Sequence, residues 1–213
     1  MGAHFTCPRC GADVRAPGLW SDSWTCPVHG GVAPLHPAVP ASAEALRQLG
    51  LRSQVPLWMP WPLPAGWLLS GVRVAGDDHT GPVAAVVACS GPNPLVVEPA
   101  DPRSADLLLV SEQPGVGLAE RLSGIGGLDP GDVSDRRPPN LKLVVGGHPT
   151  PLWSLDTDDV AAYAGEAAGV WFWAIAWPQT ALAVLLDQFE VRDARDLDPM
   201  PALPHGALSL RLG

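Results

Sequence analysis

The sequence has little positive charge, and Lys142 is its only lysine among 213 residues. Lysine and arginine together number 13 against 22 acidic residues, which gives a formal net charge of -9. A protein that binds the phosphate backbone non-specifically needs several cations on one face. The charge balance therefore disfavours nucleic acid as a partner.

Long apolar runs are also missing. The longest runs, including residues 169–178, fall short of the roughly 20 residues that a membrane-spanning helix needs. The first residues lack the basic and apolar regions of a secretory signal. We therefore expect no membrane span and a cytoplasmic protein.

Charged residues make up only 16% of the chain and hydrophobic residues 46%, which is typical of a globular protein with a substantial core. The 25 prolines and 23 glycines exclude long helices and predict many short elements joined by turns.

The four cysteines are unevenly placed, since three lie near the N-terminus. Cys7 and Cys10 occur in "CPRCG", and Cys26 and His29 occur in "CPVHG". A two-residue spacer lets a tight turn present both side chains of a pair to one ion, and zinc favours four such ligands in a tetrahedron. The sequence therefore predicts a zinc site made by Cys7, Cys10, Cys26 and His29.

Because the protein fills all four positions, we expect the zinc to be structural rather than catalytic. His36 or His4 is an alternative fourth ligand, since either imidazole could reach the same ion. A disulfide is the competing interpretation of the cysteines, but a reducing cytoplasm and the second ligand pair argue against it.

The segment between the ligand pairs, "ADVRAPGLWSDSWT", predicts a short hairpin around a Pro-Gly turn, so that residues 1–36 form a zinc ribbon. This segment has no basic cluster. We therefore expect Trp20 and Trp24 to cover the metal core rather than to stack on bases.

The remaining chain divides into three predicted parts. Residues 37–55 are a linker with a short helix that Ser42 caps and Gly50 ends. Residues 56–198 form the body, in which seven short β-leaning runs separated by turns predict an antiparallel sheet. Residues 199–213 form a tail. The expected fold class is α+β: a zinc ribbon followed by a curved antiparallel β-sheet domain with one or two short helices.

Aromatic residues concentrate in two segments of the body. In 169–177, Trp171, Trp173, Ile175 and Trp177 alternate with Phe172, Ala174 and Ala176, which predicts a central core strand with apolar side chains on both faces. The proline-rich segment 57–67 is expected to be an irregular extended strap over one face. The alternative is an aromatic-lined site for a small hydrophobic ligand. Its candidate residues are Trp58, Trp61, Trp67, Trp171 and Trp173.

The apolar spacing of Leu182, Leu185, Leu186 and Phe189 predicts an amphipathic helix, although a short apolar run of this kind also fits a strand. We expect no catalytic residues. Cys89 has no partner histidine and fits a core thiol, and Asp77, Asp78 and His79 fit a hairpin turn. Gly115 and Gly117 begin a dinucleotide-like motif, but Glu120 stands where its third glycine is required.

Several motifs, in the order "CPRCG", "VPLWMPWPLPAGWL" and "GVWFWAI", resemble an uncharacterised family of actinobacterial proteins with a zinc-ribbon start. The resemblance covers essentially the full chain and implies no established activity. Residues 56–190 are also similar to the curved antiparallel sheets of anti-sigma-factor-associated and lipoprotein-binding domains.

These features together predict a zinc-binding protein that acts as an interaction or regulatory module and binds a protein partner. The alternatives are a binder of a small hydrophobic ligand and, less favoured, a nucleic-acid binder that uses its zinc ribbon. The sequence leaves the oligomeric state open.

Overall fold

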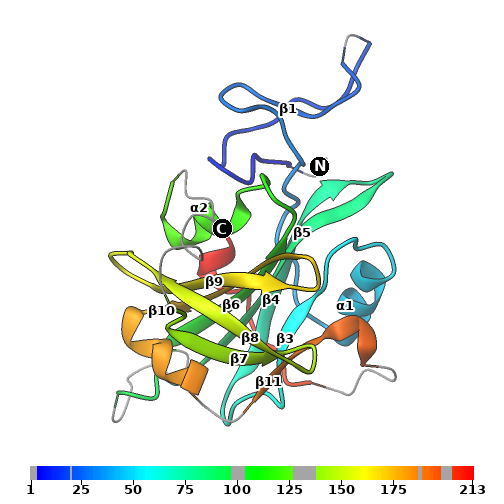
Figure 1. Ribbon diagram of the computed structural model, residues 1–213. Coiled ribbons are helices and arrows are strands. Elements are labelled where there is room, and N and C mark those ends of the chain that lie inside the picture. Colours follow the sequence, from blue (N-terminus) through cyan, green and yellow to red (C-terminus); the bar gives the residue numbers. More distant parts are fainter. Residues whose placement is uncertain (1–3, 20, 97–103, 127–137, 187–188, 198–202) are drawn as a thin grey trace.

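A computed structural model describes residues 4–19, 21–96, 104–126, 138–186, 189–197 and 203–213. In this part of the chain, nine strands form a curled, mostly antiparallel sheet that few helices accompany (Figure 1). The strand order is β3-β11-β7-β8-β9-β10-β6-β5-β4. A curved antiparallel sheet with short helices is the architecture that the sequence predicted.

All seven β-leaning runs of the body are strands, which confirms that prediction. They are β4 (Leu68–Asp77), β5 (Gly81–Gly91), β6 (Ala105–Glu112), β7 (Leu141–Val145), β8 (His148–Leu155), β9 (Ala161–Ala167) and β10 (Val170–Trp177). Strands that follow one another across a short turn pair with each other, and β10 returns to pair with β6. The turn between β7 and β8 consists of Gly146 and Gly147, both at positive φ, as a tight hairpin requires.

Two further strands were not predicted. β3 (Trp58–Trp61) pairs with β11 (Glu190–Asp193), and β11 pairs in parallel with β7. The expectation of an irregular strap is therefore wrong for residues 58–61. Pro60 is tolerated because β3 ends the strand order, and an edge strand can lack one backbone N–H.

β10 lies between β9 and β6 and has a core on each face. Phe172, Ala174 and Ala176 belong to one core, and Trp173 and Ile175 belong to the other. This confirms the predicted alternation and the central position of the strand. On the Phe172 face, the ring of Trp58 meets the ring of Phe172 edge-on at 6.1 Å, so the segment around β3 does cover this face.

The helices are short. In α1 (Ala43–Gly50), the Ser42 side chain accepts the Ala45 N–H at 3.1 Å, as predicted, and the helix extends through Gly50. α2 (Leu118–Ser123) was not predicted, and three 3-10 turns complete the set: η1 (Gln179–Leu186), η2 (Ala194–Asp196) and η3 (Leu210–Leu212). The structure describes no helix that is long and apolar enough to cross a membrane.

The predicted amphipathic α-helix near residue 182 is wrong, and so is its alternative, a strand. Residues 179–186 form a 3-10 helix that buries Ala181, Val184 and Leu185, while Leu186 is 69% exposed. Three residues per turn place positions 181 and 184 on the same side, whereas Leu186 falls outside that side. Of the predicted apolar stripe, Phe189 lies beyond this element and only packs against the core.

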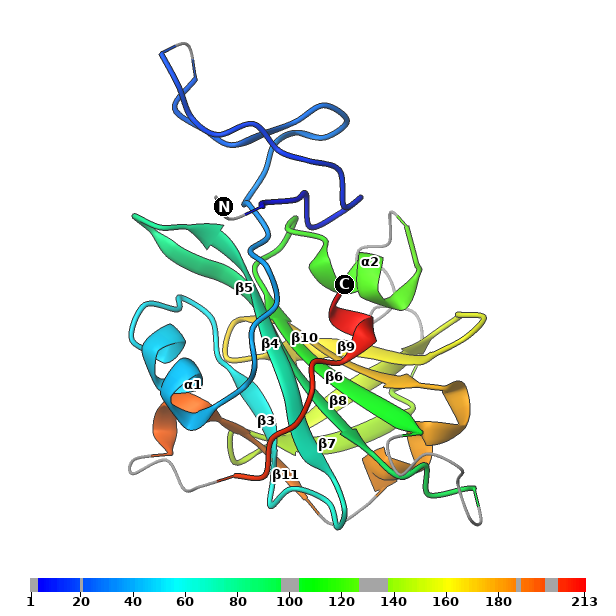
Figure 2. The same ribbon diagram turned by 180° about the vertical axis from the view of Figure 1, so that it is seen from behind.

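Two segments cover the outer edge of β4 (Figure 2). The N–H of His36 donates to Val74 O at 2.9 Å, and Val39 exchanges two hydrogen bonds with Val72. Further along the same strand, the Leu69 N–H donates to Pro204 O at 2.9 Å. These contacts satisfy an edge that would otherwise be free to pair with another chain.

Candidate metal centre

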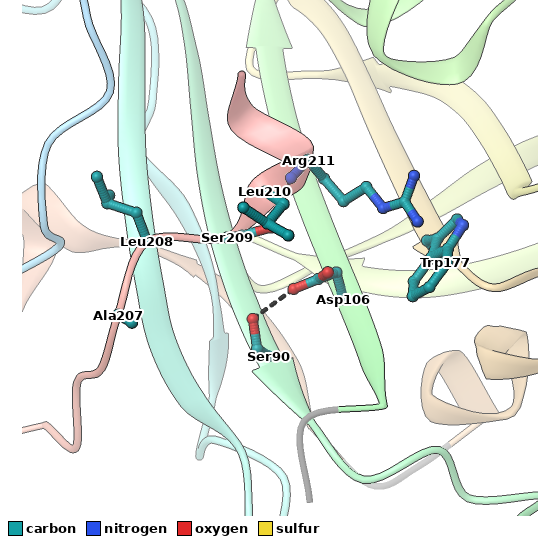
Figure 3. Close-up of a pocket in the computed structure, with 8 residues that line it drawn as sticks. All are labelled: Ser90, Asp106, Trp177, Ala207, Leu208, Ser209, Leu210 and Arg211. Carbon is teal, nitrogen blue, oxygen red and sulfur yellow. Dashed lines mark hydrogen bonds between the residues drawn. The ribbon is translucent and has the colours of Figure 1, made fainter. Parts of the chain in front are cut away.

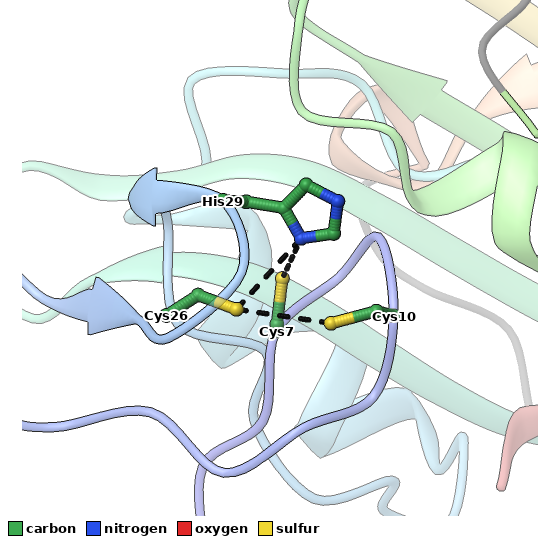
Figure 4. Close-up of side chains that lie close together, drawn as sticks. All are labelled: Cys7, Cys10, Cys26 and His29. Carbon is green, nitrogen blue, oxygen red and sulfur yellow. Dashed lines mark hydrogen bonds between the residues drawn. The ribbon is translucent and has the colours of Figure 1, made fainter.

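Cys7, Cys10, Cys26 and His29 converge on one point (Figure 4). Their ligand atoms all lie within 4.8 Å of one another. Cys7 Sγ and Cys26 Sγ lie 3.6 Å and 3.7 Å from His29 Nδ1, and Cys10 Sγ lies 3.7 Å from Cys26 Sγ. In the part of the chain that the structure describes, this is the one group of three or more such residues that could hold a metal ion.

The spacing of the ligand atoms fits a tetrahedral ion. Metal–sulfur bonds of about 2.3 Å and metal–nitrogen bonds of about 2.0 Å give tetrahedral edges of about 3.8 Å between sulfurs and about 3.5 Å between sulfur and nitrogen. The three separations given above are close to these values. A disulfide would need sulfurs about 2.05 Å apart, and all four cysteines are free.

Each ligand pair is followed by a glycine that turns the chain. Gly11 and Gly30 have φ of 74° and 71°, a conformation that glycine adopts without strain. The Gly11 N–H donates to Cys7 O at 2.8 Å, and the Val28 N–H points to Cys26 Sγ at 3.4 Å. These turns present both ligands of each pair on the same side of the backbone.

Short antiparallel pairings place the second ligand pair. β1 (Thr25–Cys26) pairs with β2 (Gly30–Gly31), and Arg15 exchanges two backbone hydrogen bonds with Thr25. Trp24 packs against Phe5 with ring centroids 4.8 Å apart, beside the ligands, whereas Trp20 lies outside the described residues. A zinc ribbon over residues 1–36 stays a prediction.

The two buried ligand thiols differ in acidity. Burial raises the pKa of Cys7 to about 11. Burial also acts to raise the pKa of Cys26, but hydrogen bonds from the backbone of Val28 and His29 and from the His29 ring outweigh it and lower the value to about 6. A bound cation would favour the thiolate form of both.

Neither alternative histidine joins the cluster. His36 Nε2 is hydrogen-bonded to Gly76 O at 2.9 Å, and its ring packs edge-on against Phe5. His4 Nε2 pairs with Asp13 at 2.9 Å. The structure therefore brings His29, and neither of these two, to the three cysteines.

Two arginines attach the ligand segment to the body. Arg9 donates to the carbonyls of Gly115 and Val116, and Arg121 of α2 donates to Cys7 O at 3.5 Å. Arg9 passes so close to Gly117 that a Cβ there would lie 2.7 Å from Arg9 Cγ. The sequence analysis did not predict these contacts and considered Gly115 and Gly117 only as part of a nucleotide-binding motif. Once that motif was rejected, the two glycines were the remaining hint that another segment passes close to the backbone there.

The five candidate tryptophans do not share a surface. Trp58 and Trp67 are buried in the core on the Phe172 side of the sheet, and Trp61 packs against it. Trp173 is buried in the core on the opposite side, where Trp171 is half-buried.

Cys89 lies in the core and residues 77–79 lie in a hairpin turn, as the sequence predicted. Cys89 is fully buried, and its burial, with a smaller effect of Asp106, raises the pKa of its thiol. Asp77 accepts the His79 N–H at 2.7 Å in the turn between β4 and β5, and this bond is the main cause that lowers the pKa of Asp77.

Comparison with known proteins gives a family without an assigned activity. A family model described as a family of unknown function, DUF6758, matches residues 1–212. No curated protein and no solved structure matches the chain. The resemblance to an uncharacterised family is confirmed over the whole chain, while the zinc-ribbon start and the actinobacterial origin stay predictions.

Proposed function

The chain belongs to this family of unknown function, and we propose that it is an interaction protein whose N-terminal segment is held by a structural zinc ion and docks on a protein partner. One observation supports the proposal above all others. Three cysteine sulfurs and one imidazole nitrogen gather within 4.8 Å of one another, and three of their separations, 3.6–3.7 Å, fit a tetrahedral site.

The donor set favours zinc among the common metals. Thiolate and imidazole ligands suit zinc, whereas magnesium and calcium prefer oxygen. Four protein ligands leave no position for an activated water, so the metal would stabilise the fold rather than catalyse a reaction. Three free ligand thiols also require a reducing compartment such as the cytoplasm.

The metal-held segment displays apolar side chains to solvent. Leu19 is 97% exposed and Val28, between two ligands, is 71% exposed. The segment projects from the sheet (Figure 1). A rigid loop loses little conformational entropy on binding, and apolar side chains on such a loop suit a pocket of a protein partner.

The alternatives have less support. Binding of a small hydrophobic ligand through one tryptophan-rich face would need the five tryptophans on a common side, and they lie on both sides of the sheet. Nucleic-acid binding would need a basic patch, which residues 1–40 do not provide.

Metal analysis of the purified chain tests the zinc site. We expect about one zinc per chain, a loss of most of it in His29→Ala, and no loss in His36→Ala, because the His36 ring bonds to Gly76 O instead. Equal zinc content in the two variants would contradict the ligand set.

Cross-linked affinity purification from the native source tests the docking surface. Leu19→Asp with Val28→Asp should keep the zinc and lose the captured protein, while Leu51→Asp, at a similarly exposed apolar residue just after α1, should keep both. A partner retained by the double variant would show that docking does not use this segment.

A further inference from the structure

A pocket of about 630 Å³ opens between the ends of β5, β6 and β10 and the segment 207–211 (Figure 3). None of the metal ligands and none of the five candidate tryptophans lines it. Its lining residues with charged or aromatic side chains are Asp106, Trp177 and Arg211. Apolar contacts come from Leu208 and Leu210.

A chain of buried hydroxyl groups holds the carboxylate of the pocket. Ser90 donates to Asp106 Oδ1, and the hydroxyl groups of Ser90 and Ser70 are hydrogen-bonded at 2.7 Å. Ser70 is 1% exposed and Ser90 is 5% exposed. A hydroxyl has one proton, so Ser90 gives its proton to Asp106 and receives that of Ser70. Buried hydroxyls cost free energy unless they are paired, and this row ends at a carboxylate that lines the pocket.

A guanidinium group forms another wall. Arg211 Cζ lies 3.5 Å from the centroid of the Trp177 ring, in a cation–π contact. Stacking fixes the plane of the guanidinium and leaves its N–H groups free at the edge, where they match the two oxygens of a carboxylate. The backbone of Arg211 is itself held, since its N–H donates to Ser209 Oγ at 3.1 Å.

Among the residues that the structure describes, neither Asp106 nor Arg211 has an ion-pair partner, since the ion pairs there join other side chains. A simple anion would meet the negative charge of Asp106, and a simple cation would meet the positive charge of Arg211. A molecule with both charges satisfies both walls.

We propose that this pocket binds a small zwitterion of the amino-acid or short-peptide type. Its ammonium group would bind Asp106, its carboxylate would bind Arg211, and its apolar part would contact Leu208, Leu210 and the exposed part of Trp177. This site is independent of the metal centre and of the docking function proposed for the N-terminal segment.

Calorimetric titration of the full zinc-loaded chain tests the site. The probes are L-leucine and the dipeptide glycyl-leucine, with N-acetyl-L-leucine and L-leucinamide as controls that each lack one charge. We expect at least one zwitterion to bind and its single-charge counterparts to bind at least about tenfold more weakly, because each loses one charge-assisted contact.

Matched variants separate the two walls. Asp106→Asn and Arg211→Gln should each weaken binding at least about tenfold, whereas Asp158→Asn and Arg52→Gln, which remove exposed charges elsewhere, should leave it unchanged. The wild-type titrations with the charge-blocked probes do not depend on how any variant folds. No binding of either zwitterion, equal binding of a blocked probe, or full binding by Asp106→Asn would each overturn the proposal.

Discussion

Glu112 is a buried acid at the end of β6, and its carboxylate takes the place of a helix cap. Its Oε2 accepts the N–H groups of Leu118 and Ala119 at 2.8 Å and 3.4 Å, at the start of α2. The N-cap residue of that helix is Gly117, which has no side chain to accept these N–H groups. Burial, with a smaller contribution from Glu120, raises the pKa of Glu112 from 4.5 to about 7 against these hydrogen bonds.

This pKa predicts how stability depends on pH. Between pH 4.5 and about 7 the folded chain keeps the Glu112 proton and the unfolded chain loses it, so the free energy of unfolding falls as the pH rises through this window. Glu112→Gln keeps an acceptor for the two N–H groups and cannot ionise. We expect it to remove this decline and to exceed wild type at pH 8 by up to about 3 kcal/mol.

Urea denaturation of the zinc-loaded proteins at pH 5, 6, 7 and 8 measures the effect, and the difference between the two proteins isolates the Glu112 contribution. Glu166→Gln, at an exposed position of β9, is the control and should follow wild type at every pH. A variant curve parallel to that of wild type would contradict the assignment.

At the scale of residues, the sequence predicted contacts between residues that lie close together along the chain. Two residues separate Cys7 from Cys10 and Cys26 from His29, and this spacing alone singled out the four residues that the structure brings together. Arg9 and Arg121 come together from distant segments, and nothing in the spacing of either arginine indicates the other.

Among the elements, β5 packs closely at its end against the segment that follows β3. Gly91 ends β5, and a Cβ built on it would lie 2.4 Å from Cγ of the Trp67 ring. Trp67 is buried in the same core as Phe172, so it cannot move aside without opening that core. The glycine therefore sets the distance at which the tryptophan covers the sheet.

Gly91→Ala should destabilise the protein by about 1–3 kcal/mol, the usual cost of overpacking a core. Gly126→Ala is the matched control, because no atom lies within 4 Å of a Cβ at that position. The midpoint of chemical denaturation measures both. A Gly91→Ala midpoint equal to that of Gly126→Ala would mean that Trp67 is not held against β5.

The strands that were predicted correctly are mostly those that pair with the next strand along the sequence. β4 and β5, for example, join through a short turn and pair along most of their length. β3 and β11 pair across most of the chain, with Trp61 opposite Glu190, and proline hides the strand pattern in β3. The 3-10 geometry of η1 was not predicted, because its short apolar run is compatible with the periods of an α-helix, a strand and a 3-10 helix alike.

In the whole molecule, the N-terminal segment that carries the cluster of three cysteines and His29 is attached to the sheet at several points. Arg73 of β4 donates to the His36 carbonyl at 2.7 Å, to Thr6 Oγ1 at 3.3 Å and to the Leu212 carbonyl. Leu35 and Leu212 are buried in the core on the Trp173 side. The segment 35–39 therefore depends on β4, while residues 5–32 carry the cluster of Cys7, Cys10, Cys26 and His29.

Removal of the metal should disorder residues 5–32 and leave residues 35–39 and the sheet intact. In Cys26→Ala, or after chelation of the wild-type protein, we expect residues 5–32 to lose protection from hydrogen exchange, because the ion would join the two turns that carry Cys7, Cys10, Cys26 and His29. Residues 35–39 and strands β4 to β10 should keep their protection, since their hydrogen bonds and cores do not involve the ion.

Hydrogen-exchange mass spectrometry with and without added zinc makes the comparison. Protection should return on adding zinc to the chelated wild type and should not return in Cys26→Ala. Loss of protection throughout the sheet would show that the metal segment and the sheet fold as one cooperative unit. Unchanged protection of residues 5–32 would show that contacts such as those of Arg9 and Arg121 order the segment without the ion.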